Sequence, residues 1–168
     1  MFFEIVSCVV VSLPVALAWS SGPCPIIADG CPSMWQHWND SCYRLTADGN
    51  TYNASLAACQ DMGGKMAAPR SHDENQFVSS LALSAGQSWV WLACDDRDVE
   101  GTWHCNGQEL TGETYENWYG GEPNNSGSNE DCAQLNPSTT KWNDISCEHI
   151  YRALCIQKSR KIMYKPTQ

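Results

Sequence analysis

The sequence is short of positive charge. Its 168 residues carry ten Lys and Arg against nineteen Asp and Glu, which gives a formal net charge of -9 at pH 7. Proteins that bind nucleic acid need a surplus of basic side chains to neutralise the phosphates, so this balance argues against nucleic acid as a partner. An acidic excess is compatible with cation binding, although acidic surfaces also simply keep exported proteins soluble.

The sequence also lacks the motifs of several common sites. It contains ten cysteines but no Cys-x-x-Cys pair, so neither a zinc ribbon nor a thioredoxin-like site is expected. The four histidines have no metal-type spacing, and no Ser/His/Asp, Cys/His or separate carboxylate pair suggests catalysis. We therefore expect a binding protein, not an enzyme, and the length suits one domain of ordinary size.

The one long apolar run lies at the N-terminus. It covers residues 5–18 and ends in Ala16-Leu17-Ala18, a small-x-small cleavage pattern. A signal anchor is the alternative, but the run contains Pro14 and is shorter than the roughly 20 residues that a bilayer core requires. We interpret residues 1–18 as a signal peptide and expect a secreted, extracellular protein that does not insert into membranes.

Cysteine usage supports export. If residues 1–18 are removed together with Cys8, nine cysteines remain, and that density predicts a disulfide framework. Because nine is odd, one thiol must be free or paired with another chain. Residues 19–30 are predicted to be a linker that carries Cys24, residues 31–157 a single domain, and residues 158–168 a basic, solvated tail.

The domain is predicted to begin with a disulfide-closed hairpin in residues 31–45. Two helical patterns follow it. In TYNASLAACQDMGG, four residues recur at helical spacing, and Gly63-Gly64 ends the pattern; the four are Tyr52, Leu56, Cys59 and Met62. In the second pattern, Ser71 to Glu74 form a capping box, in which the Ser71 hydroxyl accepts from the Glu74 amide while the Glu74 carboxylate reaches back.

The second helix is expected to face inward through Phe77, Val78 and Leu81. After Gly86 the sequence favours short strands, such as the one in SWVWLAC, and helical periodicity does not return. Long loops rich in Gly, Asn and Asp separate these strands. A loop as long as residues 106–142 would be unusual in a compact domain unless it is functional or organised by a ligand.

One of these loops is rich in side-chain oxygens. The stretch GGEPNNSGSNEDC, residues 120–132, has no apolar residue to bury, so propensity alone predicts a solvated loop. Hard cations such as calcium, however, take six to eight oxygen ligands and tolerate irregular backbone. Five donors could serve, three in this loop and two after Trp142: Glu122, Asn124, Glu130, Asn143 and Asp144.

A second acidic stretch, DDRDVEG in residues 95–101, begins like an EF-hand loop. Its twelfth position is Gly107, where an EF-hand requires a bidentate glutamate, and Cys105 lies inside the would-be loop. We therefore reject an EF-hand.

Taken together, several motifs resemble a C-type lectin domain of the long, six-cysteine form. They are the cysteine order, the two helical patterns, Trp91-Leu92-Ala93-Cys94, Glu122-Pro123-Asn124 and Trp142-Asn143-Asp144. Each short motif is weak alone, but their order between matching cysteines over about residues 31–157 is specific. The resemblance implies an α+β, disulfide-stapled C-type lectin-like fold, with two helices flanking small antiparallel sheets and long calcium-binding loops.

The resemblance also implies three disulfides, which spacing alone could not have chosen among the 105 pairings of eight cysteines. They are Cys31–Cys42, Cys59–Cys155 and Cys132–Cys147. Cys94 and Cys105 depart from the family pattern, and we infer a fourth bridge between them that joins adjacent strands. Cys24 is then the odd thiol: it could form a disulfide-linked homodimer, or a mixed disulfide, or one of the bridges is mispaired.

The family pattern assigns two calcium sites. Residues Glu122, Asn124, Glu130, Asn143 and Asp144 match the ligands of the sugar-binding calcium, and Pro123 matches a cis peptide. An auxiliary calcium matches Asp96, Glu100, Asn125 and Asp131.

The Glu-Pro-Asn order resembles the mannose-type members, which take mannose, glucose, N-acetylglucosamine or fucose. The resemblance thus implies a calcium-dependent lectin for glycans on cell or microbial surfaces, in innate immune recognition. The alternative is a domain of the same fold that binds a protein, mineral or ice surface without sugar.

Three asparagines lie in the Asn-x-Ser motif of N-glycosylation, namely Asn39, Asn53 and Asn124. Asn39 and Asn53 are candidate acceptors. A glycan on Asn124 would abolish calcium binding there, so we expect Asn124 to be unmodified.

Overall fold

The computed structural model describes residues 30–160. The expected signal peptide, Cys24 and residues 161–168 lie outside the described residues. Within residues 30–160 no helix is long and apolar enough to cross a membrane. In chain order, the elements of this range are β1 (Gln36–Trp38), β2 (Ser41–Leu45), α1 (Tyr52–Asp61), β3 (Lys65–Met66), α2 (His72–Ser84), β4 (Val90–Asp95), β5 (His104–Cys105), β6 (Gln108–Glu109), the 3-10 turn η1 (Ser126–Ser128), β7 (Cys132–Asn136), β8 (Lys141–Ile145) and β9 (Arg152–Lys158).

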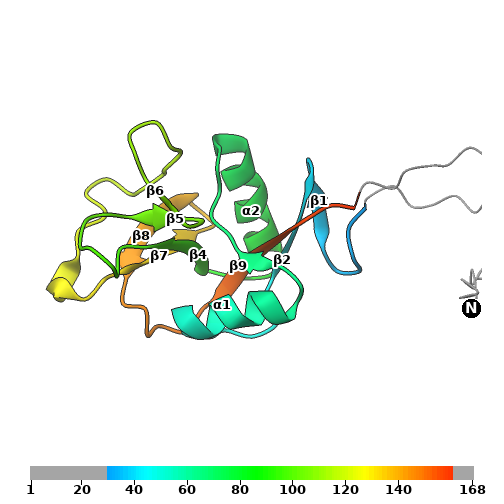
Figure 1. Ribbon diagram of the computed structural model, residues 1–168, viewed down its shortest axis with the longest axis horizontal. Helices are drawn as coiled ribbons and strands as arrows, with labels where there is room; N and C mark the ends of the chain where they lie inside the picture. The colour runs from blue at the N-terminus through cyan, green and yellow to red at the C-terminus, as the bar shows by residue number, and fades with distance from the viewer. Residues whose placement is uncertain (1–29, 161–168) are drawn as a thin grey trace, which may run out of the picture.

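The fold is α+β, as expected, with α1 and α2 on opposite sides of the strands (Figure 1). The central strand β9 pairs with β2 along one edge and with β4 and β3 along the other. Strand β4 continues the sheet to β5 and to the β7–β8 hairpin. One detail differs from the expected antiparallel sheets, because β4 and β9 pair in parallel. A long connection joins these two strands, and such a connection permits parallel pairing.

Helix α1 forms where the periodic pattern predicts it. Tyr52 and Cys59 are fully buried, and Cys59 is bridged to Cys155 in β9. The helix ends at Asp61 and is followed by Gly63, whose φ of 79° lies in the left-handed region that glycine adopts without strain. The disulfide thus fixes the buried stripe of α1 against the last strand.

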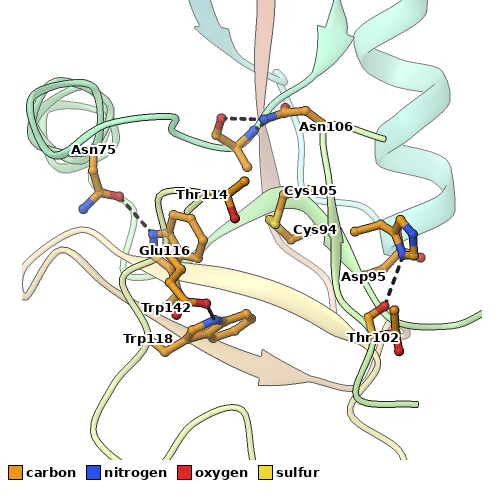
Figure 2. Close-up of a disulfide and its surroundings, with 12 residues drawn as sticks. Asn75, Cys94, Asp95, Thr102, Cys105, Asn106, Thr114, Glu116, Trp118 and Trp142 are labelled. Carbon is orange, nitrogen blue, oxygen red and sulfur yellow. Dashed lines mark hydrogen bonds between the residues drawn. A yellow bond between two sulfur atoms is a disulfide. The ribbon is translucent and has the colours of Figure 1, made fainter. Parts of the chain in front are cut away.

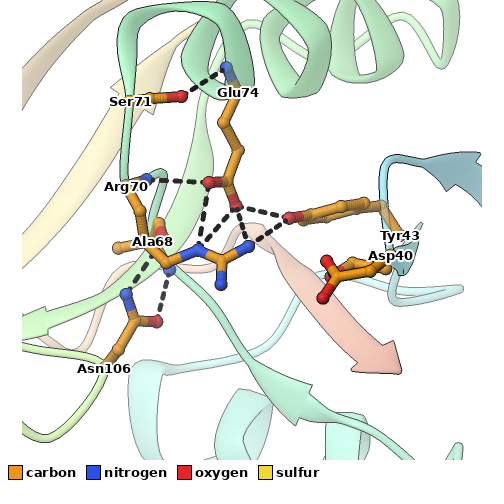
Figure 3. A network of polar contacts seen from close by, with 8 residues as sticks. Asp40, Tyr43, Ala68, Arg70, Ser71, Glu74 and Asn106 are labelled. Carbon is orange, nitrogen blue, oxygen red and sulfur yellow. Dashed lines mark hydrogen bonds and ion pairs between the residues drawn. The ribbon is translucent and has the colours of Figure 1, made fainter. Parts of the chain in front are cut away.

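Helix α2 begins with the expected cap. The Ser71 hydroxyl accepts from the Glu74 amide at 3.2 Å. The Glu74 carboxylate reaches back to the Arg70 amide at 3.0 Å and also accepts from the Tyr43 hydroxyl of β2 and from the Arg70 guanidinium (Figure 3). The carboxylate thus bonds the amide that precedes the cap and not the Ser71 amide that a capping box uses, and it belongs to a buried network, since Glu74 is only 2% exposed.

Of the residues expected on the inner face of α2, Val78 is buried, whereas Phe77 and Leu81 are half-buried and pack at the edge of the core. The polar residues Asn75 and Ser79 are more deeply buried than Phe77. Tertiary hydrogen bonds explain Asn75, whose amide group bonds both the Trp142 indole and the Thr140 carbonyl.

All four expected disulfides are present: Cys31–Cys42, Cys59–Cys155, Cys94–Cys105 and Cys132–Cys147. The additional bridge, Cys94–Cys105, joins directly opposed residues of β4 and β5 (Figure 2). Both of its cysteines are buried in the main hydrophobic core.

An indole at the end of the core anchors the loops beyond it. Trp142 is fully buried, and its Nε1 donates to Asn75 Oδ1 at 2.9 Å (Figure 2). Trp118 packs edge-on against it, with ring centroids 5.7 Å apart. The Trp142 backbone also bonds Asn117 and Tyr119 across the chain, each at 2.9 Å. These contacts hold the start of the 120–132 loop against β8.

We predict that the Cys94–Cys105 bridge, which closes the shorter loop, contributes less to stability than the Cys59–Cys155 bridge. Its cysteines are 11 residues apart, against 96 for Cys59–Cys155. In the chain-entropy model these bridges contribute roughly 3 and roughly 4 to 5 kcal/mol respectively. Cys94→Ala with Cys105→Ala should therefore lower the free energy of unfolding in urea by less than Cys59→Ala with Cys155→Ala. The reverse order would contradict the prediction.

Candidate functional site

The Glu-Pro-Asn loop folds back on β8. Tyr119 N donates to Trp142 O at 2.9 Å, Glu122 N donates to Tyr119 O at 3.1 Å, and the Glu122–Pro123 peptide is cis, as the resemblance implies. The Asn124 side-chain amide contacts the Glu122 carboxylate. The loop therefore places an acid and an amide side by side, next to the residues that follow Trp142.

Asp144 lies at the centre of this arrangement. It is fully buried, and its Oδ2 accepts from the backbone amides of Asn124 at 2.9 Å and Asn125 at 2.7 Å. Its Oδ1 is also buried and has no hydrogen-bond partner within residues 30–160. Burying an ionised carboxylate oxygen without a partner is costly, so Oδ1 is suited to a cation.

Negative charge accumulates around Asp144. The pKa of Glu122 is raised to about 7, first by partial burial, then by its hydrogen bond with the Asp144 carboxylate and by the negative charges of Asp144 and Glu130. Glu130 is held by the Ser126 amide, which donates to its Oε2 at 2.8 Å. Neighbouring carboxylates disfavour one another's ionised form, and a bound cation would stabilise that form.

The fifth expected ligand, Asn143, is placed differently. Its side-chain amide donates to the backbone oxygen of Asp144, and it forms no hydrogen bond with the side chains of the other four expected ligands in the described part of the chain. Glu122, Asn124 and Asp144 are thus brought together by the loop, Glu130 joins them electrostatically, and Asn143 lies beside them on β8.

The expected auxiliary ligands form an adjoining cluster. Asp96 is 4% exposed; its Oδ2 accepts from the Gly101 amide at 2.8 Å, while its Oδ1 is buried and unpartnered among residues 30–160. Burial, together with the charges of Glu100 and Asp131, raises the pKa of Asp96. The Asp96 backbone amide donates to the Asp131 carbonyl at 3.2 Å.

Asn125 links the two clusters. Its side-chain nitrogen donates to Glu100 Oε2, and its side-chain oxygen accepts from the Glu130 amide at 3.1 Å. Its φ of 45° lies in the left-handed region, where asparagine is tolerated better than most residues. The loop is therefore one structural unit with an acidic cluster on each side of Asn125.

The donor chemistry suits a hard cation. Within residues 30–160 no three His, Cys, Asp or Glu side chains are gathered into a group that could hold a metal by themselves. Both clusters instead mix carboxylates with asparagine amides, and each contains one buried carboxylate oxygen that lacks a partner. All of these donors are oxygens, which fits calcium and does not fit zinc or other metals that prefer nitrogen and sulfur.

Sequence reasoning missed the groups that orient Asp144. The amides of Asn124 and Asn125 belong to the backbone, so no residue type signals them. Asn75, which holds the Trp142 indole, lies 67 residues away in α2. The sequence signal for Asn75 was that a polar residue stood on the expected inner side of α2, where it would need a hydrogen-bond partner.

Comparisons with known proteins show which family and fold this chain is similar to. The family model described as "Lectin C-type domain" matches residues 48–157. A relative, C-type lectin domain family 4 member M of Nomascus concolor, is 34% identical over 118 residues, which make up 70% of this chain and 29% of the relative. The chain therefore spans less than a third of that relative.

Two solved structures are similar as well. The mouse scavenger receptor C-type lectin carbohydrate-recognition domain has a TM-score of 0.70 and 28% identity, covering 79% of this chain and 100% of that one. The carbohydrate-recognition domain of cow CD23, in the presence of a GlcNAc2Man3 oligosaccharide, has a TM-score of 0.68 and 26% identity, covering 76% of this chain and 95% of that one.

We predict that Asp144→Asn weakens calcium binding at least about tenfold. The substitution removes the charge of the buried carboxylate, and if the one remaining oxygen accepts from the two backbone amides, an NH2 group replaces the oxygen that could bind the cation. Titration calorimetry with calcium measures the effect, and circular dichroism checks the fold. Asp61→Asn, an exposed position at the end of α1, removes the same charge and should bind calcium as the wild type does. Equal affinities for Asp144→Asn and the wild type would contradict the prediction.

The raised pKa of Glu122 predicts a pH dependence in the metal-free protein. With a folded-state pKa of about 7 against an ordinary value of 4.5, the folded protein keeps a proton that the unfolded chain releases between these values. The free energy of unfolding should therefore fall as pH rises through this window. Urea midpoints measured with chelator at about pH 5 and about pH 8 should differ less for Glu122→Gln than for the wild type or Asp61→Asn. An unchanged difference in Glu122→Gln would assign the pH dependence to other groups.

Proposed function

Because the chain belongs to the C-type lectin domain family, we propose that it is a calcium-dependent lectin whose Glu-Pro-Asn loop and β8 together bind sugar. Domains of this family are typically calcium-dependent and non-catalytic. The observation that carries the proposal for this chain is the buried, unpartnered Oδ1 of Asp144 beside the acidic Glu122 and Glu130.

Five side chains would hold the ion: Glu122, Asn124, Glu130, Asn143 and Asp144. When bound, calcium supplies a positive centre that accepts lone pairs from neighbouring sugar hydroxyls. The hydroxyl protons need acceptors, which the carboxylates of Glu122 and Glu130 provide. The remaining hydroxyl lone pairs need donors, which the side-chain amides of Asn124 and Asn143 provide. Each hydroxyl of a vicinal pair can thus be fully satisfied by one acid and one amide.

We propose sugars of the mannose type, namely mannose, glucose, N-acetylglucosamine and fucose. The support is the order of acid and amide along the cis Glu122–Pro123 loop, where the two side chains are in direct contact. The related CD23 domain, whose structure contains a mannose-bearing oligosaccharide, is compatible with this class. Asp96, Glu100, Asn125 and Asp131 would hold the auxiliary calcium, which stabilises the same loop through Asn125.

We further propose that the protein is secreted and binds glycans on cell or microbial surfaces, in an immune role, with two copies joined through Cys24. The linkage of two copies is supported by where the described residues begin and end. Arg160 N donates to Gly30 O at 2.8 Å, so the two ends of the described chain adjoin, at the opposite end of the molecule from the 120–132 loop (Figure 1). Linkage there leaves both sugar sites open, and two weak sites acting together bind a surface more tightly than one.

The test is retention on immobilised mannose. The wild type should be retained with calcium and released by chelator or free mannose. Exchanging the acid and the amide, with Glu122→Gln and Asn124→Asp, should move retention from mannose towards galactose, since the donors and acceptors then suit a different pair of hydroxyls. A protein that flows through the mannose column with calcium present would overturn the proposal and favour a sugar-independent surface-binding domain.

A further inference from the structure

A cavity of about 420 Å³ is lined by residues of β3 and β9 and of the turns beside them. The outer end of β9 lies away from the 120–132 loop (Figure 1). This volume is within the range of small-molecule sites. Its walls come from the β1–β2 turn, the Gly63-Gly64 segment after α1, the start of α2 and the end of β9. The lining residues that the argument uses are Asp40, Gly64, Lys65, Arg70, Ile156 and Lys158.

The charge of this cavity is opposite to that of the protein. The chain has nineteen acidic residues and ten Lys and Arg, yet three of those ten line the cavity together with Asp40 as its one acid. Lys65 and Lys158 are exposed, and neither forms an ion pair or side-chain hydrogen bond within residues 30–160. Lys65 is paired with Ile156 in the sheet, and Lys158 lies two residues further along β9, so both lysines project from the same face.

Arg70 adds a fixed donor to this face. Its Nε and Nη2 are bonded to the Glu74 carboxylate, which is 2% exposed, and Nη2 also donates to the Tyr43 hydroxyl at 3.3 Å (Figure 3). Its Nη1 has no hydrogen-bond partner in the described part of the chain. Because Glu74 already orients the guanidinium, an anion that binds Nη1 immobilises little further side-chain freedom.

The other lining groups suit hydroxyls. Asp40 is exposed but held in place, since its Oδ1 accepts from the Ser41 hydroxyl at 3.1 Å and its backbone oxygen accepts from Ser159 N at 2.9 Å. Its Oδ2 is without a partner among residues 30–160, so it can accept a proton from a ligand hydroxyl. A ligand that was purely anionic would be repelled by this carboxylate.

The walls beside the lysines are apolar and flat. Ile156 contributes an aliphatic surface, and the backbone at Gly64 lies so close to the sheet that a Cβ there would be 2.7 Å from Ile156 O. A sugar ring can pack on such a surface while its substituents contact the rim.

From these groups we infer that the cavity is a second, calcium-independent site for a sugar that carries a sulfate or phosphate monoester. The anionic ester contacts Lys65, Lys158 and the free edge of Arg70, and a hydroxyl of the ring donates to Asp40. The inference does not depend on the proposed lectin function, because none of these residues is an expected calcium ligand.

The test uses glucose 6-sulfate and glucose 6-phosphate as probes, with chelator present throughout. Titration of the 15N-labelled protein should shift the amide signals of Gly63 and Gly64, which line the cavity, and unmodified glucose should not. Lys65→Gln with Lys158→Gln should weaken binding at least about tenfold, since two unpaired charges are removed. The two probes show which ester the site prefers.

Two control variants test the location. Arg44→Gln with Lys141→Gln removes the same charge outside the cavity, and Lys161→Gln with Lys165→Gln removes the basic residues of the C-terminal segment. Both should keep wild-type affinity. If either weakens binding as much as the cavity variant does, the inference is overturned.

Two further outcomes are also decisive. Equal binding of unmodified glucose, or of inorganic sulfate and phosphate alone, would overturn the assignment to an anionic sugar. With calcium present, Lys65→Gln with Lys158→Gln should keep the wild-type retention on mannose. Failure of the cavity site and failure of the lectin function are therefore seen in separate experiments.

Discussion

Much of the loop region depends on the burial of one carboxylate, that of Asp144. A buried charge requires partners, and one of its oxygens takes them from two consecutive backbone amides of the 120–132 loop. Asp144 is itself placed by the pairing of β8 with β7, by the buried Trp142 two residues earlier and by the Cys132–Cys147 bridge. A loop with no apolar residue of its own is thereby held without a core.

The residues that stabilise the fold are different from those that form the candidate site. The hydrophobic clusters, the disulfides and the Tyr43–Glu74–Arg70 network hold the strands and helices together. Acidic and amide side chains are then free to gather at one end, where they raise one another's pKa. Gly30 and Arg160, where the described residues begin and end, lie at the other end of the ribbon (Figure 1), and the end of β9 that precedes Arg160 lines the basic cavity. With opposite charges at opposite ends, the proposed cation site and the proposed anion site would be screened from one another by salt.

Local patterns predicted most of the fold. The helices formed where apolar spacing placed them, and Ser71 capped α2 as its sequence indicated. The misses share a cause. Glu74 and Asn75 are polar residues on the buried side of α2, and their burial depends on the partners Tyr43 and Trp142, which come from other elements. The parallel β4–β9 pair likewise joins strands about 60 residues apart. Periodicity cannot detect either, because it compares only near neighbours.

By itself, the sequence determined the donors: five oxygen-bearing side chains in two segments, a second acidic group, and cysteines whose family pattern implied the pairing. Residue type decides which atoms can bind a cation, and residue types are known from the sequence without a structure. Only the tertiary structure decided which oxygens remain without a partner, because that depends on which backbone amides approach Asp144 and Asp96. It also gathered Lys65, Arg70 and Lys158 into one cavity, since residues far apart in the chain become neighbours only when β3, α2 and β9 pack together.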